Sequence, residues 1–148
     1  MSSRKNAFVI ASTDHGTMIV NRYDYNTCGD GRYGVGHNLL EHGSFDKFDA
    51  ILLKQLLDLQ RERAGDGVIA IDGGANIGVH TVEWARHMTG WGHVIGIEAQ
   101  ERIFYALAGN VSVNNCFNAR GINAALSDSE GLLSIPVPDY TAPGSFGS

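Results

Sequence analysis

The chain has 148 residues, 43% of them hydrophobic and 18% charged, which suits one globular domain. A formal net charge of -5 argues against a nucleic acid or an anionic membrane as partner, since both select basic surfaces. Cys28 and Cys116 form no motif and indicate free thiols in a reducing compartment. No segment has the apolar length of a secretory signal or a membrane span, so we expect a cytoplasmic protein.

The N-terminal part predicts a hairpin, a loop and a long helix. Two apolar runs, residues 7–11 and 17–20, flank Asp14-His15-Gly16 and predict a short β-hairpin. Residues 21–36 are polar, glycine-rich and aperiodic, which is typical of a loop. From residue 45 to 63, apolar residues recur every three or four positions and predict an amphipathic helix. Its predicted buried stripe consists of Phe48, Ile51, Leu52, Leu56 and Leu59.

Leucines also occur off that stripe, at Leu53 and Leu57. The helix is therefore either well buried in the domain or presents a face to a partner.

From residue 68 onward, short apolar runs alternate with amphipathic segments. Strands are predicted over 68–71, 93–97, 119–126 and 132–137, and helices over 77–88 and 101–115. Pro136 makes the last strand an edge strand. This alternation predicts an α/β fold, with a mostly parallel sheet and helices on both of its faces. In such sheets, ligands bind beyond the carboxyl ends of the strands.

Two glycine-rich stretches compete as ligand-binding loops. Residues 29–34 match the dinucleotide pattern G-x-G-x-x-G, but no strand precedes them and no helix follows, so we expect a surface turn. Residues 72–78 follow an apolar strand and open a helix, whose free N–H groups suit an anion. Ala75 stands where the dinucleotide pattern has its second glycine, which favours a carboxylate over a pyrophosphate.

Two acidic residues restrict the class of ligand further. Asp72 would repel a phosphate and attract an ammonium group, so the loop suits an amino acid moiety. Glu98 ends the second predicted strand, where a carboxylate can accept two hydrogen bonds from a ribose diol. An amino acid and a ribose in one ligand indicate S-adenosylmethionine. The alternative for Glu98 is a solvated carboxylate at a strand end.

The stretches IDGGANIGVHTVEWA and GHVIGIEAQERIFYALAGNVSVNN resemble the FkbM-type S-adenosylmethionine-dependent methyltransferases. The resemblance covers roughly residues 68–131 and includes the four-residue spacing of Asn110 and Asn114. It implies a Rossmann-like class I methyltransferase fold with an N-terminal β-hairpin. It also implies O-methylation of a hydroxyl group on a small molecule or a sugar. A non-catalytic or incomplete nucleotide- or cofactor-binding module is the alternative.

The resemblance implies cofactor contacts along the loop and at the strand ends. The residues are Asp72, Gly73, Gly74, Ala75, Asn76 and Gly78 around the methionine part, Glu98 at the ribose, and Ala99 and Ala124 near the adenine. No catalytic residue is assigned, and the candidates for a general base are His80, His42 and Glu41. His80 has the alternative of a polar residue at the pocket rim. No histidine or cysteine spacing matches a metal site, so we expect none.

The resemblance also divides the chain. Residues 1–64 precede the core, and residues 65–148 form the N-terminal half of a cofactor-binding domain. Members of the family continue after the third strand, and their fourth strand lies beside the first, so we expect this chain to be truncated there. The first strand then has an unpaired edge, which predicts self-association.

Overall fold

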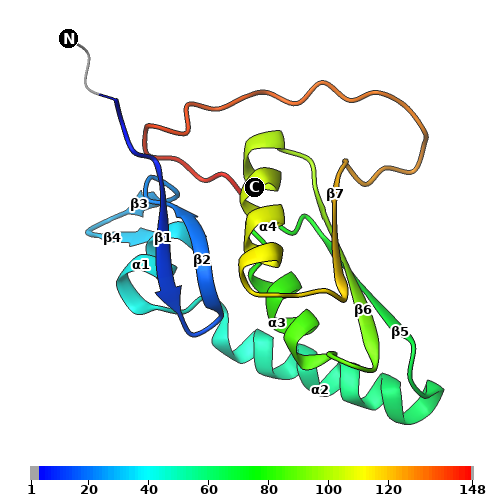
Figure 1. Cartoon of the computed structure of the whole chain (residues 1–148). Coiled ribbons are helices and arrows are strands. Elements are labelled where there is room, and N and C mark those ends of the chain that lie inside the picture. Colours follow the sequence, from blue (N-terminus) through cyan, green and yellow to red (C-terminus); the bar gives the residue numbers. More distant parts are fainter. Residues whose placement is uncertain (1–3, 148) are drawn as a thin grey trace.

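The computed structural model describes residues 4–147 (Figure 1). The strands are β1 (Phe8–Thr13), β2 (Gly16–Asn21), β3 (Asn26–Cys28), β4 (Gly31–Tyr33), β5 (Val68–Gly73), β6 (Gly92–Glu98) and β7 (Ala119–Asn123). The helices are α1 (Val35–His42), α2 (Lys47–Ala64), α3 (Val79–His87) and α4 (Glu101–Val113).

The central sheet is parallel and has the order β5-β6-β7. Ala70 pairs with Val94, and Ile97 pairs with Ile122. Helices α3 and α4 form the two crossovers, and all three strands end together at the top of Figure 1. The predicted strand–helix alternation and the parallel sheet are therefore confirmed for β5 to β7.

Helices cover one face of this sheet. A Cβ atom at Gly96 would lie 2.7 Å from the Thr81 hydroxyl of α3, and one at Gly121 would lie 3.1 Å from the Phe104 ring of α4. On the opposite face, Ile69 and Ile71 are each 61% exposed. Within residues 4–147 the expectation of helices on both faces is thus wrong. The reason is that α2 lies beside α3, through ion pairs such as Lys54–Glu83, and does not cross to the other face.

Two asparagine side chains fasten the β1–β2 hairpin to α4. Asn110 accepts the Ile19 N–H through Oδ1 at 2.5 Å and donates to the Ile19 carbonyl at 3.2 Å. Asn114 makes the same pair of bonds to Thr17, at 3.1 Å and 2.8 Å. One helical turn of about 5.4 Å nearly matches two strand residues of about 6.7 Å. The spacing of the two asparagines therefore presents two amide groups to alternate residues of β2.

The predicted hairpin over residues 7–20 is confirmed as β1 and β2. The predicted loop over residues 21–36 is wrong in part, because it contains the β3–β4 hairpin and the start of α1. Residues 29–30 form the exposed turn of that hairpin, so the expected surface turn is confirmed there, whereas residues 31–33 form β4 and Gly34 caps α1. The expectation that no strand precedes residues 29–34 and no helix follows them is wrong. Helix α1 is not predicted from the sequence because it contains Gly36, and glycine disfavours helices. A Cβ at Gly36 would lie 2.2 Å from the Asn21 carbonyl, so packing requires the glycine.

Helix α2 is confirmed, but its predicted buried stripe is wrong. Phe48 is 89% exposed, and the other four residues of the stripe are exposed as well. The buried side contains Ala50 instead, with Leu57 partly buried against the core. Only one side of α2 contacts α3 and β5, so the remaining apolar residues have no described neighbour to cover them. A partner-binding face on α2 stays a prediction.

The last predicted strand, residues 132–137, is also wrong, and β7 ends at Asn123 before the predicted residue 126. The Asn123 side chain donates to the carbonyls of Glu98 at 2.8 Å and Ala99 at 3.1 Å. The Ala124 N–H donates to the Glu98 carbonyl as well, at 3.2 Å. Leu132 and Leu133 are exposed, and Pro136 has no N–H for a ladder.

Candidate functional site

A cavity of about 510 Å³ lies at the carboxyl ends of β5, β6 and β7. Its floor is formed by Gly73, Gly74 and residues 97–100, and its walls by residues 124–126, 133–136 and 146–147. A second cavity, of about 470 Å³, lies between the N-terminal segment and Arg102 and does not reach the glycine loop. The first cavity is therefore the one at the position where parallel α/β sheets bind ligands.

The backbone of the glycine loop is bonded to β6. The N–H groups of Gly74 and Ala75 both donate to the Ile97 carbonyl at 2.9 Å. Gly74 has a φ of 73°, which favours glycine, and a Cβ there would meet no atom within 4 Å. The space beside Gly74 is thus open to a ligand that lies against the main chain.

Glu98 joins the loop to the turn that follows β6. Its Oε2 accepts the N–H of Asn76 at 2.9 Å, and its Oε1 accepts the N–H of Gln100 at 2.8 Å. The side chain is buried at 6% exposure, so the alternative of a solvated strand-end carboxylate is wrong. A carboxylate has about four lone-pair sites, so two bonds leave acceptor capacity toward the cavity.

Asp72 lies beneath the loop, at the end of β5. It is buried, and its Oδ2 accepts the Thr81 hydroxyl of α3 at 2.5 Å. Thr81 is fully buried, so this bond fixes the orientation of the carboxylate. Asp72 is not among the residues that line the cavity.

The structure brings five of the nine predicted cofactor residues together around the cavity. They are Gly73, Gly74, Glu98, Ala99 and Ala124. Asp72, Ala75, Asn76 and Gly78 lie behind this lining. Gly78 begins α3 with a φ of 86°, and a Cβ there would lie 2.4 Å from the Leu107 side chain of α4. The glycine at position 78 is therefore needed for packing against α4, and the close approach there is not to a ligand.

None of the candidate bases lines the cavity. His80 lies on α3 and stacks on Trp84, with ring centroids 5.7 Å apart. Glu41 and His42 are exposed at the end of α1, and the His37 and His42 rings meet edge to face at 5.9 Å. In the described part of the chain, no group of three or more acidic, histidine or cysteine residues is placed to hold a metal ion. None of the helices there combines the length and the apolar character needed to cross a membrane.

Sequence reasoning missed the wall contributed by the C-terminal residues. The segment after β7 arches over the strand ends to the β1–β2 hairpin and returns toward α4 (Figure 1). Phe146 and Gly147 then border the cavity opposite Glu98, and Gln100 bonds to Phe146. The only local signal is an aromatic residue among small ones, GSFGS, which carries no information about a contact with residues 24 and 100.

Comparison with known proteins shows the fold. No family model matches the chain, and no curated protein sequence matches it. Among solved structures, Trm5b from Pyrococcus abyssi is similar with a TM-score of 0.52 and 10% identity, over 83% of this chain and 30% of that chain. The chain has a methyltransferase fold. The predicted Rossmann-like class I architecture is thereby confirmed for the sheet β5-β6-β7 and its helices, together with the N-terminal hairpin.

Two further solved structures are similar. An S-adenosylmethionine-dependent methyltransferase from Agrobacterium tumefaciens has a TM-score of 0.49 and 14% identity, over 82% of this chain and 33% of that chain. The tRNA (uracil-54, C5)-methyltransferase of Pyrococcus abyssi, in complex with S-adenosyl-L-homocysteine, has a TM-score of 0.47 and 16% identity. That match covers 81% of this chain and 24% of the other. The chain thus spans between 24% and 33% of the length of these three proteins.

Proposed function

We propose that this chain binds S-adenosylmethionine and forms the cofactor-binding part of a methyltransferase that resembles the FkbM type. The observation that carries the proposal is Glu98. A buried carboxylate, oriented by two backbone N–H groups, faces a cavity beside the open backbone of Gly74. In methyltransferase-fold sheets this is the position from which a carboxylate can accept the two hydroxyl groups of a ribose.

The proposed placement of the cofactor follows the cavity. The adenine lies against Ala99 and Ala124, and the ribose lies at Glu98. The methionine part lies along the loop formed by Asp72, Gly73, Gly74, Ala75, Asn76 and Gly78. Asp72 is held by Thr81 and supplies negative charge below the loop, which supports an ammonium group there. In this proposal residues 65–148 carry the cofactor, and residues 1–64 precede this half.

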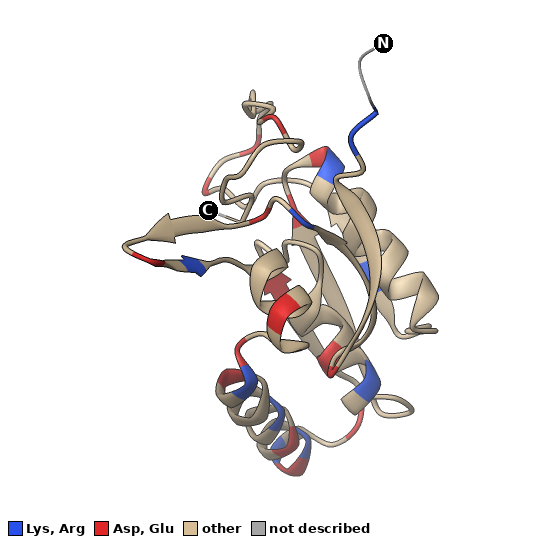
Figure 2. Ribbon diagram, turned by 90° about the vertical axis from the view of Figure 1, so that its left-hand side faces the viewer, with Lys and Arg blue, Asp and Glu red and all other residues tan. Residues whose placement is uncertain are grey.

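The proposed acceptor is a hydroxyl group on a small molecule or a sugar. A net charge of -5 supports an acceptor other than a nucleic acid. Acidic and basic residues are interspersed along α2, at the bottom of Figure 2, which gives no uniformly basic face there. Methyl transfer from a sulfonium requires above all the alignment of the acceptor with the methyl group. His80, His42 and Glu41 remain the proposed candidates for a base. Free Cys28 and Cys116 support a cytoplasmic location.

The second candidate function is a cofactor-binding module without catalysis. It is favoured by the position of the candidate bases, none of which lines the cavity. The two functions differ in one measurement, the transfer of a labelled methyl group from S-adenosylmethionine to a panel of sugars and small hydroxyl compounds, with tRNA included. Labelling of tRNA alone would overturn the proposed acceptor class, and binding without any transfer would favour the module.

The cofactor proposal is tested by calorimetric titration with S-adenosylhomocysteine, with NAD as the parallel ligand. We expect saturable binding of the first and none of the second. Glu98→Gln places an amide N–H against a backbone N–H and removes the charge, so affinity falls at least about tenfold. Glu101→Gln is the matched control, because Glu101 is exposed and bonds to Tyr105. Equal affinity of the two variants would contradict the role of Glu98.

A further inference from the structure

The C-terminal segment from residue 140 to residue 147, here called the strap, is bonded to the N-terminal half of the chain. The Asn21 amide donates to the Tyr140 carbonyl at 3.0 Å, and the Gly144 N–H donates to the Tyr23 carbonyl at 3.0 Å. Gly144 also forms an isolated parallel bridge with Asp24. The strap is therefore positioned by residues more than a hundred positions earlier in the sequence.

Phe146 is fixed from two sides. Its N–H donates to Asp24 Oδ1 at 3.1 Å, and its carbonyl accepts the Gln100 side chain at 2.6 Å. Gln100 also accepts the Tyr140 hydroxyl at 3.0 Å, and the Tyr140 and Phe146 rings lie 5.0 Å apart. Phe146 is 2% exposed. The main chain of Phe146 thus links Asp24 to the turn that contains Glu98 and Gln100.

The strap also contacts the glycine loop directly. A Cβ atom at Gly147 would lie 2.3 Å from the Asn76 amide nitrogen, so the strap passes as close as a glycine allows. Phe146 and Gly147 line the cavity together with Glu98 and Gln100. The strap is in consequence one wall of the cavity, opposite the strand ends.

Asp24 attaches this wall to the N-terminal half of the chain at Phe146. It is 3% exposed, and besides Phe146 its carboxylate accepts the Gly36 N–H of α1 at 3.1 Å. Burial raises the pKa of Asp24 above its ordinary value, although the N–H groups of Phe146 and Gly36 lower it. Burial of the Asp24 carboxylate therefore opposes folding, and its two N–H partners offset part of that cost.

We infer that Asp24 is a positioning residue of the cofactor cavity: it holds the strap as a cavity wall, so that cofactor affinity depends on a side chain outside the lining. The inference rests on the proposed function. Asp24 acts through the Phe146 main chain, and Gln100 supplies the second attachment from the cofactor side. The strap and the glycine loop close the cavity together.

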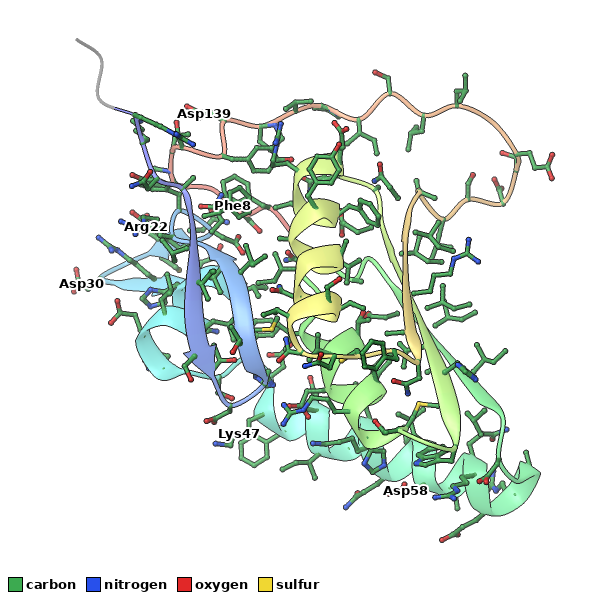
Figure 3. The ribbon with its side chains drawn as sticks, in the orientation of Figure 1. Phe8, Arg22, Asp30, Lys47, Asp58 and Asp139 are labelled. Carbon is green, nitrogen blue, oxygen red and sulfur yellow. The ribbon has the colours of Figure 1, made fainter. Side chains whose placement is uncertain are left out.

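The test compares Asp24→Asn with Asp30→Asn. Asp30 lies at the tip of the β3–β4 hairpin, far from the central sheet (Figure 3), so the same chemical change there is the control. We expect about tenfold weaker binding of S-adenosylhomocysteine for Asp24→Asn, because Asn offers one uncharged acceptor oxygen to the N–H groups of Phe146 and Gly36, and the attachment of the wall is weakened. Asp30→Asn changes affinity by less than about twofold. Melting temperatures stay similar, since Asp24→Asn also removes a buried charge.

Hydrogen exchange separates this inference from the proposed function. In Asp24→Asn, with no ligand present, the amides of residues 140–147 exchange faster than in the original chain, while α4 is unchanged. If the original chain does not bind S-adenosylhomocysteine, the proposed function fails, and this comparison still tests the role of Asp24. If both variants bind equally, or if strap exchange is the same in both, the inference is overturned while the cofactor proposal stands.

The unmodified chain gives a reading that does not depend on the folding of a variant. The Phe146 amide should exchange more slowly than those of the exposed residues 126–133, and more slowly again with S-adenosylhomocysteine bound. Exchange of the strap as fast as that of residues 126–133 would overturn the inference.

Discussion

The glycine loop, residues 72–78, and the arch, residues 124–139, border the same cavity but are held in different ways. The loop donates N–H groups to Ile97 and Glu98 of β6. In the arch, residues 124–134 are all exposed, and Ser127 bonds only to its close neighbours Asp128 and Ser129. The loop is thus bonded to the sheet along its length, whereas the arch is bonded to the sheet at Ala124 and continues into the strap at its other end.

The two sides of the cavity therefore differ in how many hydrogen bonds and buried contacts hold them. Local opening has a low free energy where few apolar contacts and few protected hydrogen bonds exist. We therefore expect a ligand in this cavity to contact a floor at Gly74 and Glu98 that is already bonded to the sheet, and to add contacts to the arch. The substitutions below test that contrast, in decreasing order of the change that we predict.

Asn110→Ala should have the largest effect on stability, because it removes the side chain that joins α4 to β2 and to the end of the glycine loop at Ile77. Asn110 is fully buried and also donates to the Ile77 carbonyl at 2.7 Å, in addition to its two bonds to Ile19. Leaving these backbone groups unpaired lowers the free energy of unfolding by about 3 to 4 kcal/mol. Urea denaturation measures the change. Ser112→Ala, on the exposed side of α4, is the control and should differ little.

The second-largest effect should come from acid, which weakens the contact between α3 and the β1–β2 hairpin. The hydrogen bond from His15 lowers the pKa of Glu83 to about 2, with Lys54 contributing and burial opposing. A carboxyl group with a lowered pKa stabilises the fold above its unfolded pKa, and this contribution is lost as the pH falls from about 4.5 to about 2. The loss amounts to about 3 kcal/mol.

Glu83→Gln supplies the control for that pH dependence. The variant should be less stable than the original chain at pH 7 and should lose less stability between pH 5 and pH 2. Urea denaturation across this range, for both proteins, measures the difference. Parallel curves would contradict the role of Glu83.

A pair of glycine substitutions compares the loop and the arch directly. Gly78→Ala forces a side chain into a left-handed conformation and against Leu107, so it should destabilise the fold by about 2 kcal/mol. Gly131→Ala adds a methyl group in the arch, where a Cβ meets no atom within 4 Å, and should be close to neutral. Thermal unfolding measures both. Similar destabilisation by the two would mean that the arch is packed as tightly as the loop.

Leu133→Ser should have the smallest effect on stability and a measurable one on binding. Leu133 is exposed but lines the cavity, whereas Leu52 on α2 is exposed and lies outside this lining. Both serine variants should unfold within about 0.5 kcal/mol of the original chain. Only Leu133→Ser should weaken the binding of S-adenosylhomocysteine, by calorimetry, because apolar contact with the ligand is lost. Equal affinities would place the arch outside the ligand site.

Features set by a local pattern of residues can be predicted from the sequence, whereas features set by contacts between distant residues cannot. The strand ending in Asp72, the loop after it and Glu98 could be located because each follows from a local pattern of apolar and small residues. Helix α1 was missed because Gly36 is set by a contact with Asn21, which no local pattern contains. The predicted burial of the apolar stripe on α2 is wrong because periodicity locates an apolar face and does not say what covers it. Phe146 was missed for the same reason, since its partners Asp24 and Gln100 are distant in sequence.

The paired asparagines of α4 have a consequence for how the hairpin aligns. Because Asn110 and Asn114 bind Ile19 and Thr17, a shift of β2 by one residue would break both amide pairs at once. Such a shift would also turn Met18 and Val20, which are fully buried, to the opposite side. The asparagine pairs of α4 and the burial of Met18 and Val20 therefore select the same register for β2.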